Sequence, residues 1–336
     1  MNATHMRLSR SLLVSVAALG MTISAQTTEL RLVSTAWPPF TNPPGQPRFA
    51  LDLVEAALSR IGIKSSTTIV DAAQFTPALL SGKFDGSGAA WKDAKRETTL
   101  LFSQPYLENR LMLVARRDGE VSATKLADLA GKRIAIVEGY SYGEIEQSGP
   151  TFVPSRTEED SVRLLLDGKV DYALVDELVV QYIVSNYADE ARSRLQIGSN
   201  ALLTRPLHLA VRRSLPDAAS IVERFNAQLR GMITDRTYHR LLHLDWIRAD
   251  VDGDGVPEYV PQSDRPGAAG PSRAYNLFFT DPMDPSITPK PIEKGRFLIG
   301  GSIYDGWTAV PDRFKVEDPK RPDPNKATLG IFRFVW

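Results

Sequence analysis

The strongest constraint on the fold is a repeated alternation of strand-like and helix-like segments between residues 29 and 246. Segment 29–34 alternates apolar and polar residues, as a β-strand does, whereas segment 49–61 places apolar residues three and four positions apart, as a helix does. Strands that alternate with helices favour parallel sheets covered by helices. The sequence therefore predicts an α/β fold. Further strands are expected at 64–70, 111–115, 132–137, 170–175 and 207–211, and further helices at 75–80, 158–166, 178–187, 216–232 and 237–246.

Two blocks of this alternation, joined near 112 and again near 206, predict two lobes with a cleft between them. We place lobe 1 at residues 27–112 together with 206–248, and lobe 2 at residues 113–205. Ligand sites in open α/β sheets lie at the carboxyl ends of strands. The side chains expected at such ends are Trp37, Arg96, Ser141 and Asp176.

The N-terminal residues differ from the rest of the chain. Arg7 and Arg10 precede an apolar run, 12–23, which small and polar residues follow. This order is typical of a cleaved secretory signal peptide, which we place at residues 1–25. The run is shorter than the roughly 20 apolar residues that span a bilayer. We therefore expect export and a periplasmic location.

Composition excludes several classes of function. Forty basic residues balance forty acidic ones, so no overall field attracts nucleic acid, and we expect no nucleic-acid partner. The chain has no cysteine, which excludes disulfides and a thiol nucleophile. No phosphate-binding glycine loop or nucleophile elbow is present either, and the sequence requires no cofactor.

Residues 249–336 form an extension of different composition. Residues 250–336 hold twelve of the 23 prolines, which disfavours long helices, and eleven of the 28 aromatic residues, which argues against simple disorder. Segments 297–303 and 329–336 have the pattern of strands. We expect an irregular, β-type extension.

The extension begins with an Asp-rich loop that could hold a structural calcium ion. Oxygen ligands at positions 1, 3 and 5, a glycine at position 6, a carbonyl at position 7 and an acid at position 9 suit a hard cation. The glutamate expected at position 12 is Pro261. A solvated acidic turn is the alternative. The candidate ligands are Asp250, Asp252, Asp254, Val256 and Glu258.

Arg96 is the strongest candidate for a ligand contact. It stands six residues before Phe102 in a Phe-Ser-x-Pro-Tyr segment. Its planar guanidinium group can bind a carboxylate through two parallel hydrogen bonds. Buried charges must be paired, so a dry cleft with Arg96 on one wall and Asp176 on the other suits a zwitterion. Asp176 could instead only cap the helix that follows it.

Residues 28–248 resemble the extracellular solute-binding proteins of the polar amino acid type, the periplasmic receptors of ABC importers. The order and spacing of the matching segments, rather than any one of them, carry the resemblance. These segments are Trp37-Pro-Pro-Phe40, Phe49-x-Leu-Asp-Leu53, Pro77-Ala-Leu-x-x-Gly-Lys-x-Asp85, Arg96-x5-Phe-Ser-x-Pro-Tyr106, Asp128-Leu-x-Gly-Lys-x-Ile-Ala135 and Gly168-Lys-Val-Asp-x-Ala-x-x-Asp176.

The resemblance implies a two-lobed Venus-flytrap fold, the periplasmic-binding-protein type II fold, that closes on one solute. It implies that Arg96 holds the α-carboxylate, that Asp176 receives the α-ammonium group, and that Trp37 covers the ligand side chain. Tyr140 and Ser141 take the place of the loop that helps to hold the carboxylate. A monomer that delivers its ligand to an ABC permease in the inner membrane is the implied assembly.

Two positions depart from the family pattern. Trp91 stands where relatives carry a small hydroxylated residue, and Ala72 stands where they often carry a second aromatic residue. We interpret Trp91 as a ligand-contacting residue that fills the space left by Ala72. A pocket reshaped in this way would still stack a flat or apolar ligand.

The sequence thus predicts a receptor for an amino acid or a related small carboxylate. One alternative is a dehydratase-like enzyme on the same fold, with Glu138, Glu144 or Asp176 as the proton donor. The other is a protein that binds the cell envelope or a partner through residues 249–336.

Overall fold

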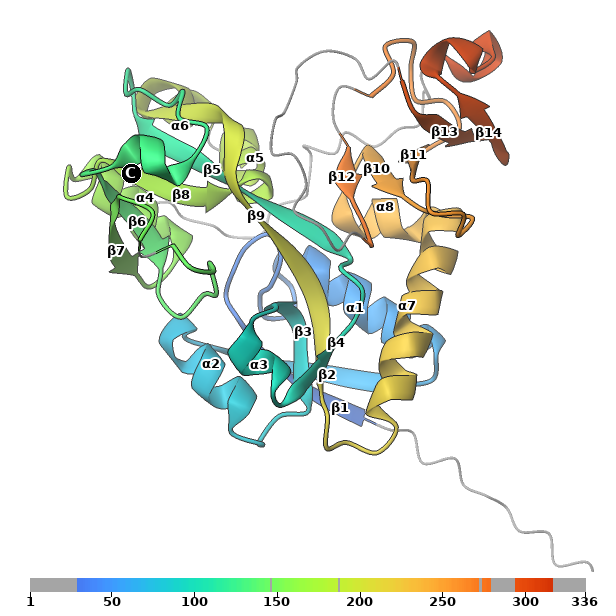
Figure 1. Cartoon of the computed structure of the whole chain (residues 1–336), viewed down its shortest axis with the longest axis horizontal. Helices are drawn as coiled ribbons and strands as arrows, with labels where there is room; N and C mark the ends of the chain where they lie inside the picture. Colours follow the sequence, from blue (N-terminus) through green and yellow to red (C-terminus); the bar gives the residue numbers. More distant parts are fainter. Residues whose placement is uncertain (1–28, 146, 187, 272–273, 279–293, 317–336) are drawn as a thin grey trace, which may run out of the picture.

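The computed structural model describes residues 29–145, 147–186, 188–271, 274–278 and 294–316 (Figure 1). Nine strands form its larger sheet: β1 (Glu29–Thr35), β2 (Lys64–Val70), β3 (Gly86–Trp91), β4 (Leu100–Phe102), β5 (Leu107–Arg116), β6 (Arg133–Val137), β7 (Thr151–Ser155), β8 (Tyr172–Asp176) and β9 (Leu195–Arg212). Their order is β2-β1-β3-β9-β5-β8-β6-β7, and β4 pairs with β9.

Helices pack against this sheet because each has one apolar face. In α1 (Phe49–Arg60), for example, Leu51, Val54 and Leu58 recur at helical spacing and are fully buried. Two of the helices begin where a side chain satisfies a free backbone N–H group: Asp93 accepts from the Arg96 backbone, and Thr157 accepts from the Asp160 backbone. The α-helices are α1 (Phe49–Arg60), α2 (Ala72–Leu80), α3 (Ala94–Glu97), α4 (Glu158–Leu166), α5 (Glu177–Asn186), α6 (Ala188–Arg194), α7 (Ala218–Thr234) and α8 (Thr237–Leu242). A 3₁₀ turn, η1, spans Leu126–Leu129.

The elements divide into two lobes. We call β1–β4 with α1–α3, α7 and α8 lobe 1, and β6–β8 with α4–α6 lobe 2. Strand β1 runs parallel to β2 and β3, and β6 runs parallel to β7 and β8. The predicted α/β architecture with two lobes is confirmed.

Strands β5 and β9 join the lobes (Figure 1). They pair in antiparallel fashion from Leu107 opposite Leu207 to Arg116 opposite Leu195, and the register shifts between Leu111 and Val114. Such irregularities bend a strand locally. The bend lies where the two strands pass from one lobe to the other. Both strands are longer than predicted, since the expected segments 111–115 and 207–211 cover only part of each.

The extension adds a second sheet. Its strands are β10 (Trp246–Ala249), β11 (Glu258–Pro261), β12 (Tyr275–Asn276), β13 (Arg296–Ile299) and β14 (Ser302–Asp305), in the order β12-β10-β11-β13-β14. Trp246, Phe297 and Trp307 form the centre of its small core. Two 3₁₀ turns, η2 (Trp307–Ala309) and η3 (Asp312–Phe314), follow the sheet. The predicted β-type extension is confirmed for its described residues.

One expected strand of the extension is a hairpin. The prediction of a single strand at 297–303 was wrong, because Gly300 and Gly301 both have positive φ and turn the chain between β13 and β14. Two successive residues with positive φ form the tight turn that matches the twist of paired strands. The strand expected at 329–336 lies outside the described residues.

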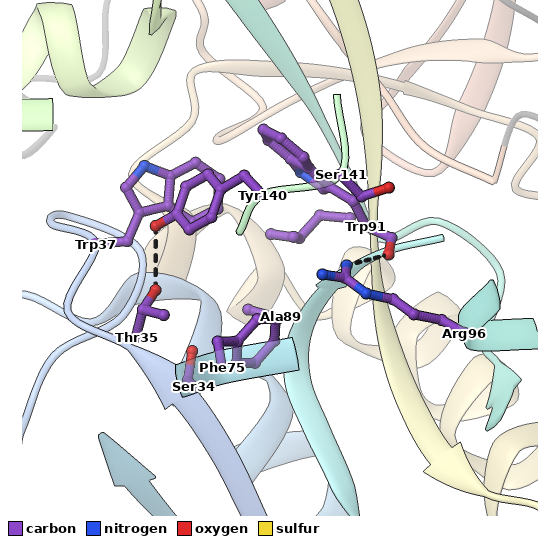
Figure 2. Close-up of a pocket in the computed structure, with 10 residues that line it drawn as sticks. Ser34, Thr35, Trp37, Phe75, Ala89, Trp91, Arg96, Tyr140 and Ser141 are labelled. Atoms are coloured by element: carbon purple, nitrogen blue, oxygen red, sulfur yellow. Dashed lines mark hydrogen bonds between the residues drawn. The ribbon is translucent and has the colours of Figure 1, made fainter. Parts of the chain in front are cut away.

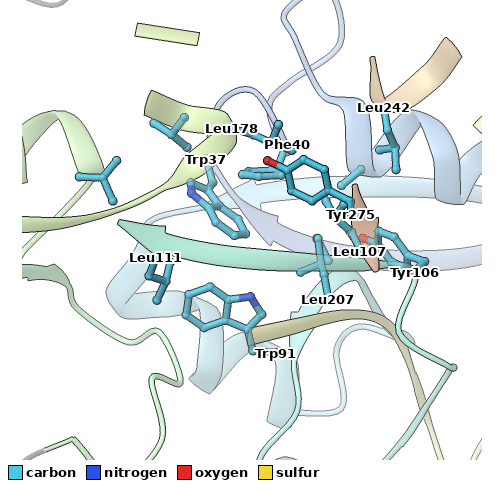
Figure 3. Packing of buried hydrophobic residues seen from close by; sticks show 14 of the residues in the cluster. Trp37, Phe40, Trp91, Tyr106, Leu107, Leu111, Leu178, Leu207, Leu242 and Tyr275 are labelled. Carbon is cyan, nitrogen blue, oxygen red and sulfur yellow. The ribbon is translucent and has the colours of Figure 1, made fainter. Parts of the chain in front are cut away.

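The extension docks on the joining strand β5. The backbone N–H of Phe278 donates to the Pro105 carbonyl (2.9 Å), and the Asn276 side chain donates to Glu108 (2.9 Å). Tyr275 donates to Glu177 at the start of α5 in lobe 2 (2.8 Å). Figure 3 shows the Tyr275 ring beside Tyr106 and Leu107. These contacts of the extension therefore reach the joining strand β5 and the start of α5 in lobe 2.

The described helices include none that is long and apolar enough to cross a membrane. The segment expected to be a signal peptide, residues 1–25, lies outside the described residues.

Candidate functional site

A small cavity lies between the lobes, near the joining strands. Ser34 and Thr35 at the end of β1, Phe75 of α2 and Ala89 of β3 contribute to its wall, together with Leu207. Five of the six predicted ligand-contacting residues also line it, and Figure 2 shows them converging from both lobes. These five are Trp37, Trp91, Arg96, Tyr140 and Ser141.

Aromatic side chains fill most of this cleft. The ring centroids of Trp37 and Trp91 are 5.6 Å apart, and Tyr140 lies 5.5 Å from each of them. The cavity leaves about 20 Å³ for the centres of water molecules. One water needs roughly 10–15 Å³ measured in this way. The cleft in this arrangement admits a water molecule, and a larger ligand requires the rings or the lobes to move apart.

Arg96 is held rigidly at the cavity wall. The Asp93 side chain accepts the Arg96 backbone N–H (2.8 Å) and so fixes the start of α3. The Arg96 guanidinium is buried; Nη1 donates to the Trp91 carbonyl (2.7 Å) and Nη2 to Thr76 Oγ1 (2.8 Å). Burial lowers the pKa of Arg96 from its usual value, and the nearby charge of Arg205 lowers it further, whereas Asp93 raises it. An arginine remains protonated nonetheless. The wall thus carries a fixed positive charge.

Arg205 is a second cation near the site that sequence reasoning missed. It lies on β9, its guanidinium is 5.9 Å from the centroid of Trp91, and Nη2 donates to the Lys92 carbonyl (3.0 Å). Asp93 is a shared counter-charge for Arg205 and Arg96. No local motif marks Arg205, because only the pairing of β9 brings it beside Trp91.

Hydrogen bonds join the lobes around the cavity, among them one from Thr76 of α2 to the Gly139 carbonyl of lobe 2 (3.4 Å). Tyr140 of lobe 2 shares a hydrogen bond with Thr35 (3.1 Å), and the indole N–H of Trp37 donates to Glu158 (3.1 Å). A longer bond of 3.4 Å runs from Arg96 to the Gly139 carbonyl of lobe 2. These contacts hold the two lobes together.

Glu158 was also missed from the sequence. It occupies the first turn of α4, where an acidic residue normally indicates a solvent-facing helix start. Here the side chain is buried against Trp37. Burial raises the pKa of Glu158 well above its usual value, and the charge of Asp176 raises it further.

Asp176 ends β8 but does not belong to the described cavity wall. Its side chain is 1% exposed, and Oδ1 accepts the backbone N–H of Leu178 at the start of α5 (2.8 Å). Burial raises the pKa of Asp176 to about 7, although the Leu178 N–H and the Asn109 side chain oppose the rise. Asn109 in turn accepts a hydrogen bond from the indole N–H of Trp91 (2.8 Å). Trp91 and Asn109 thus link the cavity wall to Asp176.

The other candidate acids lie elsewhere. Glu138 and Glu144 are exposed and do not line the cavity. The described geometry therefore places none of the three proposed proton donors at the cavity wall.

The predicted calcium loop brings Asp250, Asp252 and Asp254 together, with one oxygen of each within 4.8 Å of the others. Arg296 of β13 pairs with Asp252 (3.0 Å) and with Asp254. The loop acids thus already face a protein cation.

The remaining predicted ligands of the loop differ in exposure. Val256 is 48% exposed, and its backbone N–H donates to Asp254. Glu258 is fully buried, lies 3.2 Å from Arg296 and accepts the Val251 backbone N–H (3.0 Å). Calcium binding stays a prediction.

Comparison with known proteins identifies relatives of most of the chain. A sequence profile of the bacterial extracellular solute-binding proteins, family 3, matches residues 31–248. The ABC transporter arginine-binding protein 1 of Escherichia coli is 23% identical over 216 residues, which are 62% of this chain and 86% of that protein. The solved structure of an ancestral arginine-binding protein bound to arginine superposes with a TM-score of 0.54 at 24% identity, over 64% of this chain and 96% of the other. This likeness supports the type II fold.

Two further relatives are longer proteins. The membrane-bound lytic murein transglycosylase F of Ectopseudomonas mendocina is 27% identical over 241 residues, which are 67% of this chain and 47% of that protein. The virulence sensor protein BvgS of Bordetella bronchiseptica is 32% identical over 113 residues, which are 32% of this chain and 9% of the sensor. The chain thus spans less than half of either protein.

Proposed function

Because this chain belongs to family 3 of the bacterial extracellular solute-binding proteins, we propose that it is a periplasmic receptor for an amino acid or a related small carboxylate. We further propose that it delivers this solute, as a monomer, to an ABC permease of the inner membrane. The observation that supports the proposal is the fixed guanidinium of Arg96 at the wall of an aromatic cavity between two lobes.

The energetics of such a site fit reversible capture. Each charge-assisted hydrogen bond contributes about 1.5–3 kcal/mol. Three or four of them, less the cost of immobilising the ligand, give roughly −8 kcal/mol, which corresponds to micromolar affinity. Because Arg96 contacts lobe 1 and lobe 2 groups alike, a ligand bound there favours the closed arrangement of the lobes.

A ligand screen on the purified, exported protein tests the proposal. Thermal shift across amino acids and organic acids, with mass spectrometry of copurified compounds, should identify a ligand, and calorimetry should give its affinity. Arg96→Lys keeps the charge but loses the planar fork, so we expect at least tenfold weaker binding. Arg163→Lys, at an exposed position of α4 in lobe 2, is the matched control. Unchanged affinity in Arg96→Lys would exclude Arg96 as the carboxylate contact.

An enzyme on the same fold is the second candidate, because a buried carboxyl group with a pKa of about 7, Asp176, could act as a proton donor at neutral pH. Its position off the described cavity wall favours the receptor. Turnover of a prephenate-like compound would favour the enzyme, whereas recovery of an unchanged bound ligand favours the receptor. A third proposal is that the extension binds a partner or the cell envelope. Because β12 docks on β5 and on α5 of lobe 2, this role is compatible with either a receptor or an enzyme.

A further inference from the structure

We infer that the ligand is a small carboxylate that lacks an α-ammonium group, because Trp91 and Asn109 separate Asp176 from the cavity. The inference rests on the proposed function and specifies the ligand class of the same site. It replaces the zwitterion that the sequence favours.

The first step concerns the charges that a ligand meets. The cavity wall offers the guanidinium of Arg96 and the hydroxyl groups of Ser34, Thr35 and Ser141. Arg205 adds a second positive charge behind Trp91. Among the described lining residues there is no carboxylate. The wall therefore suits the carboxylate end of a ligand and supplies no charged acceptor for an ammonium group.

The second step concerns the acids nearest to the cavity. One oxygen of Glu158 accepts the indole N–H of Trp37, and one oxygen of Asp176 accepts the Leu178 N–H at the start of α5; neither acid lines the cavity. Asp176 interacts with Asn109, which accepts the indole N–H of Trp91, and with Glu158, which accepts the indole N–H of Trp37. Trp91 thus occupies the place through which a small residue would let an ammonium group reach Asp176.

The third step concerns the aromatic rings, whose faces could also attract a cation. Such a contact requires a free ring face within about 6 Å. The guanidinium of Arg205 already lies over Trp91 at 5.9 Å, and that of Arg96 lies over Phe75 at 5.3 Å. At these two rings an added ammonium group would approach an arginine cation, and the two arginines share the single counter-charge of Asp93. The rings instead offer apolar surface to a flat or apolar tail.

Matched ligand pairs test the inference on the unmodified protein. 3-Phenylpropionate and phenylalanine differ only in the α-ammonium group, as do propionate and alanine. Calorimetry at pH 7.5 should show each acid binding at least tenfold more tightly than its amino acid. An amino acid that binds as tightly as its matched acid, or more tightly, overturns the inference. If no carboxylate or amino acid of the wider screen binds, the proposed function itself fails.

A substitution at Trp91 tests the mechanism. Trp91→Thr restores a small hydroxylated residue and opens the path to Asp176, so the preference for the acid should fall at least tenfold. Trp246→Phe, in the core of the extension, is the matched loss of a tryptophan and should leave the preference unchanged. An unchanged preference in folded Trp91→Thr overturns the role of Trp91. Should that variant not fold, the ligand pairs on the parent protein still decide the ligand class.

Discussion

Arg110 should be one of the most costly residues to replace in this protein. It lies on β5 between Glu108 and Glu177 and pairs with both, at 3.5 Å in the case of Glu177. The three side chains are 9%, 1% and 3% exposed, respectively. Arg110 also donates to the Ala274 carbonyl and lies 4.5 Å from the centroid of Tyr275 in the extension. One cation therefore compensates two buried acids and ties the extension to the joining strand.

Arg110→Met removes the charge and keeps an apolar stem of similar length. Breaking a buried ion pair from one side costs about 3–5 kcal/mol, because the partner is left buried without compensation. We therefore expect the free energy of unfolding to fall by about 4 kcal/mol, measured by urea denaturation followed through tryptophan fluorescence. Arg117→Met is the control, since Arg117 is 54% exposed and pairs at the surface with Asp118, where a loss of at most about 1 kcal/mol is expected.

A triple variant separates the charge effect from packing. Glu108→Gln with Arg110→Met and Glu177→Gln leaves no uncompensated charge, so it should recover most of the lost stability. A loss below about 1 kcal/mol in Arg110→Met, or no recovery in the triple variant, would refute the reasoning that one cation compensates both acids.

Three further predictions concern protonation and calcium. Burial raises the pKa of Asp176 from 3.8 to about 7, so its contribution to stability is complete below pH 4 and is lost as the pH rises towards 7. The resulting fall in the free energy of unfolding between pH 4 and 7 is at most about 4 kcal/mol and can be measured by urea denaturation. Asp176→Asn should abolish this fall, and an unchanged pH profile in the variant would contradict the raised pKa. Burial lowers the pKa of His239 from 6.5 to about 4, so its contribution is complete above pH 6.5 and is lost as the pH falls. His239→Gln should therefore reduce acid destabilisation between pH 6.5 and 4 by up to about 3 kcal/mol, and equal sensitivity of both proteins would count against it. Calcium should raise the melting temperature of the parent protein but not that of Asp252→Ala. The rise should be larger in Arg296→Ala, because this variant lacks the competing cation, and no effect on the parent protein would refute calcium binding.

The local pattern of apolar residues predicted those helices and strands in which buried residues recur at the regular spacing of the element. The helical spacing at 49–61 corresponds to α1, because its apolar stripe packs directly on the sheet. Strand β9 was predicted only at its C-terminal end, since Gly198, Asn200 and Pro206 are typical of loops. Pairing with β5 holds these residues in extended conformation. A partner strand distant in sequence therefore overrode local preference.

The candidate site also contains residues that the sequence pattern predicted and residues whose role depends on a partner distant in sequence. The family pattern placed Arg96 and four other residues that line the cavity. It gave no sign of Glu158 or Arg205, because neither belongs to a local motif and each acquires its role from a partner on another element. For Asp176 it implied a ligand contact, whereas the alternative reading of the residue as the cap of the following helix agrees with its hydrogen bond from the Leu178 N–H.

The family match ends at residue 248, but the fold has no domain boundary there, because residue 248 lies within β10. A chain shortened there would lose the partners of β10 on both sides and uncover Ile247, which is fully buried. It would also strip Glu108 and Glu177 of their hydrogen bonds from the extension. Any loss of ligand or partner binding after such a truncation would thus be confounded with damage to the receptor itself. Substitutions on the exposed rim of the second sheet, for instance at Ile303, which is 39% exposed, probe the extension while leaving the body of the receptor intact.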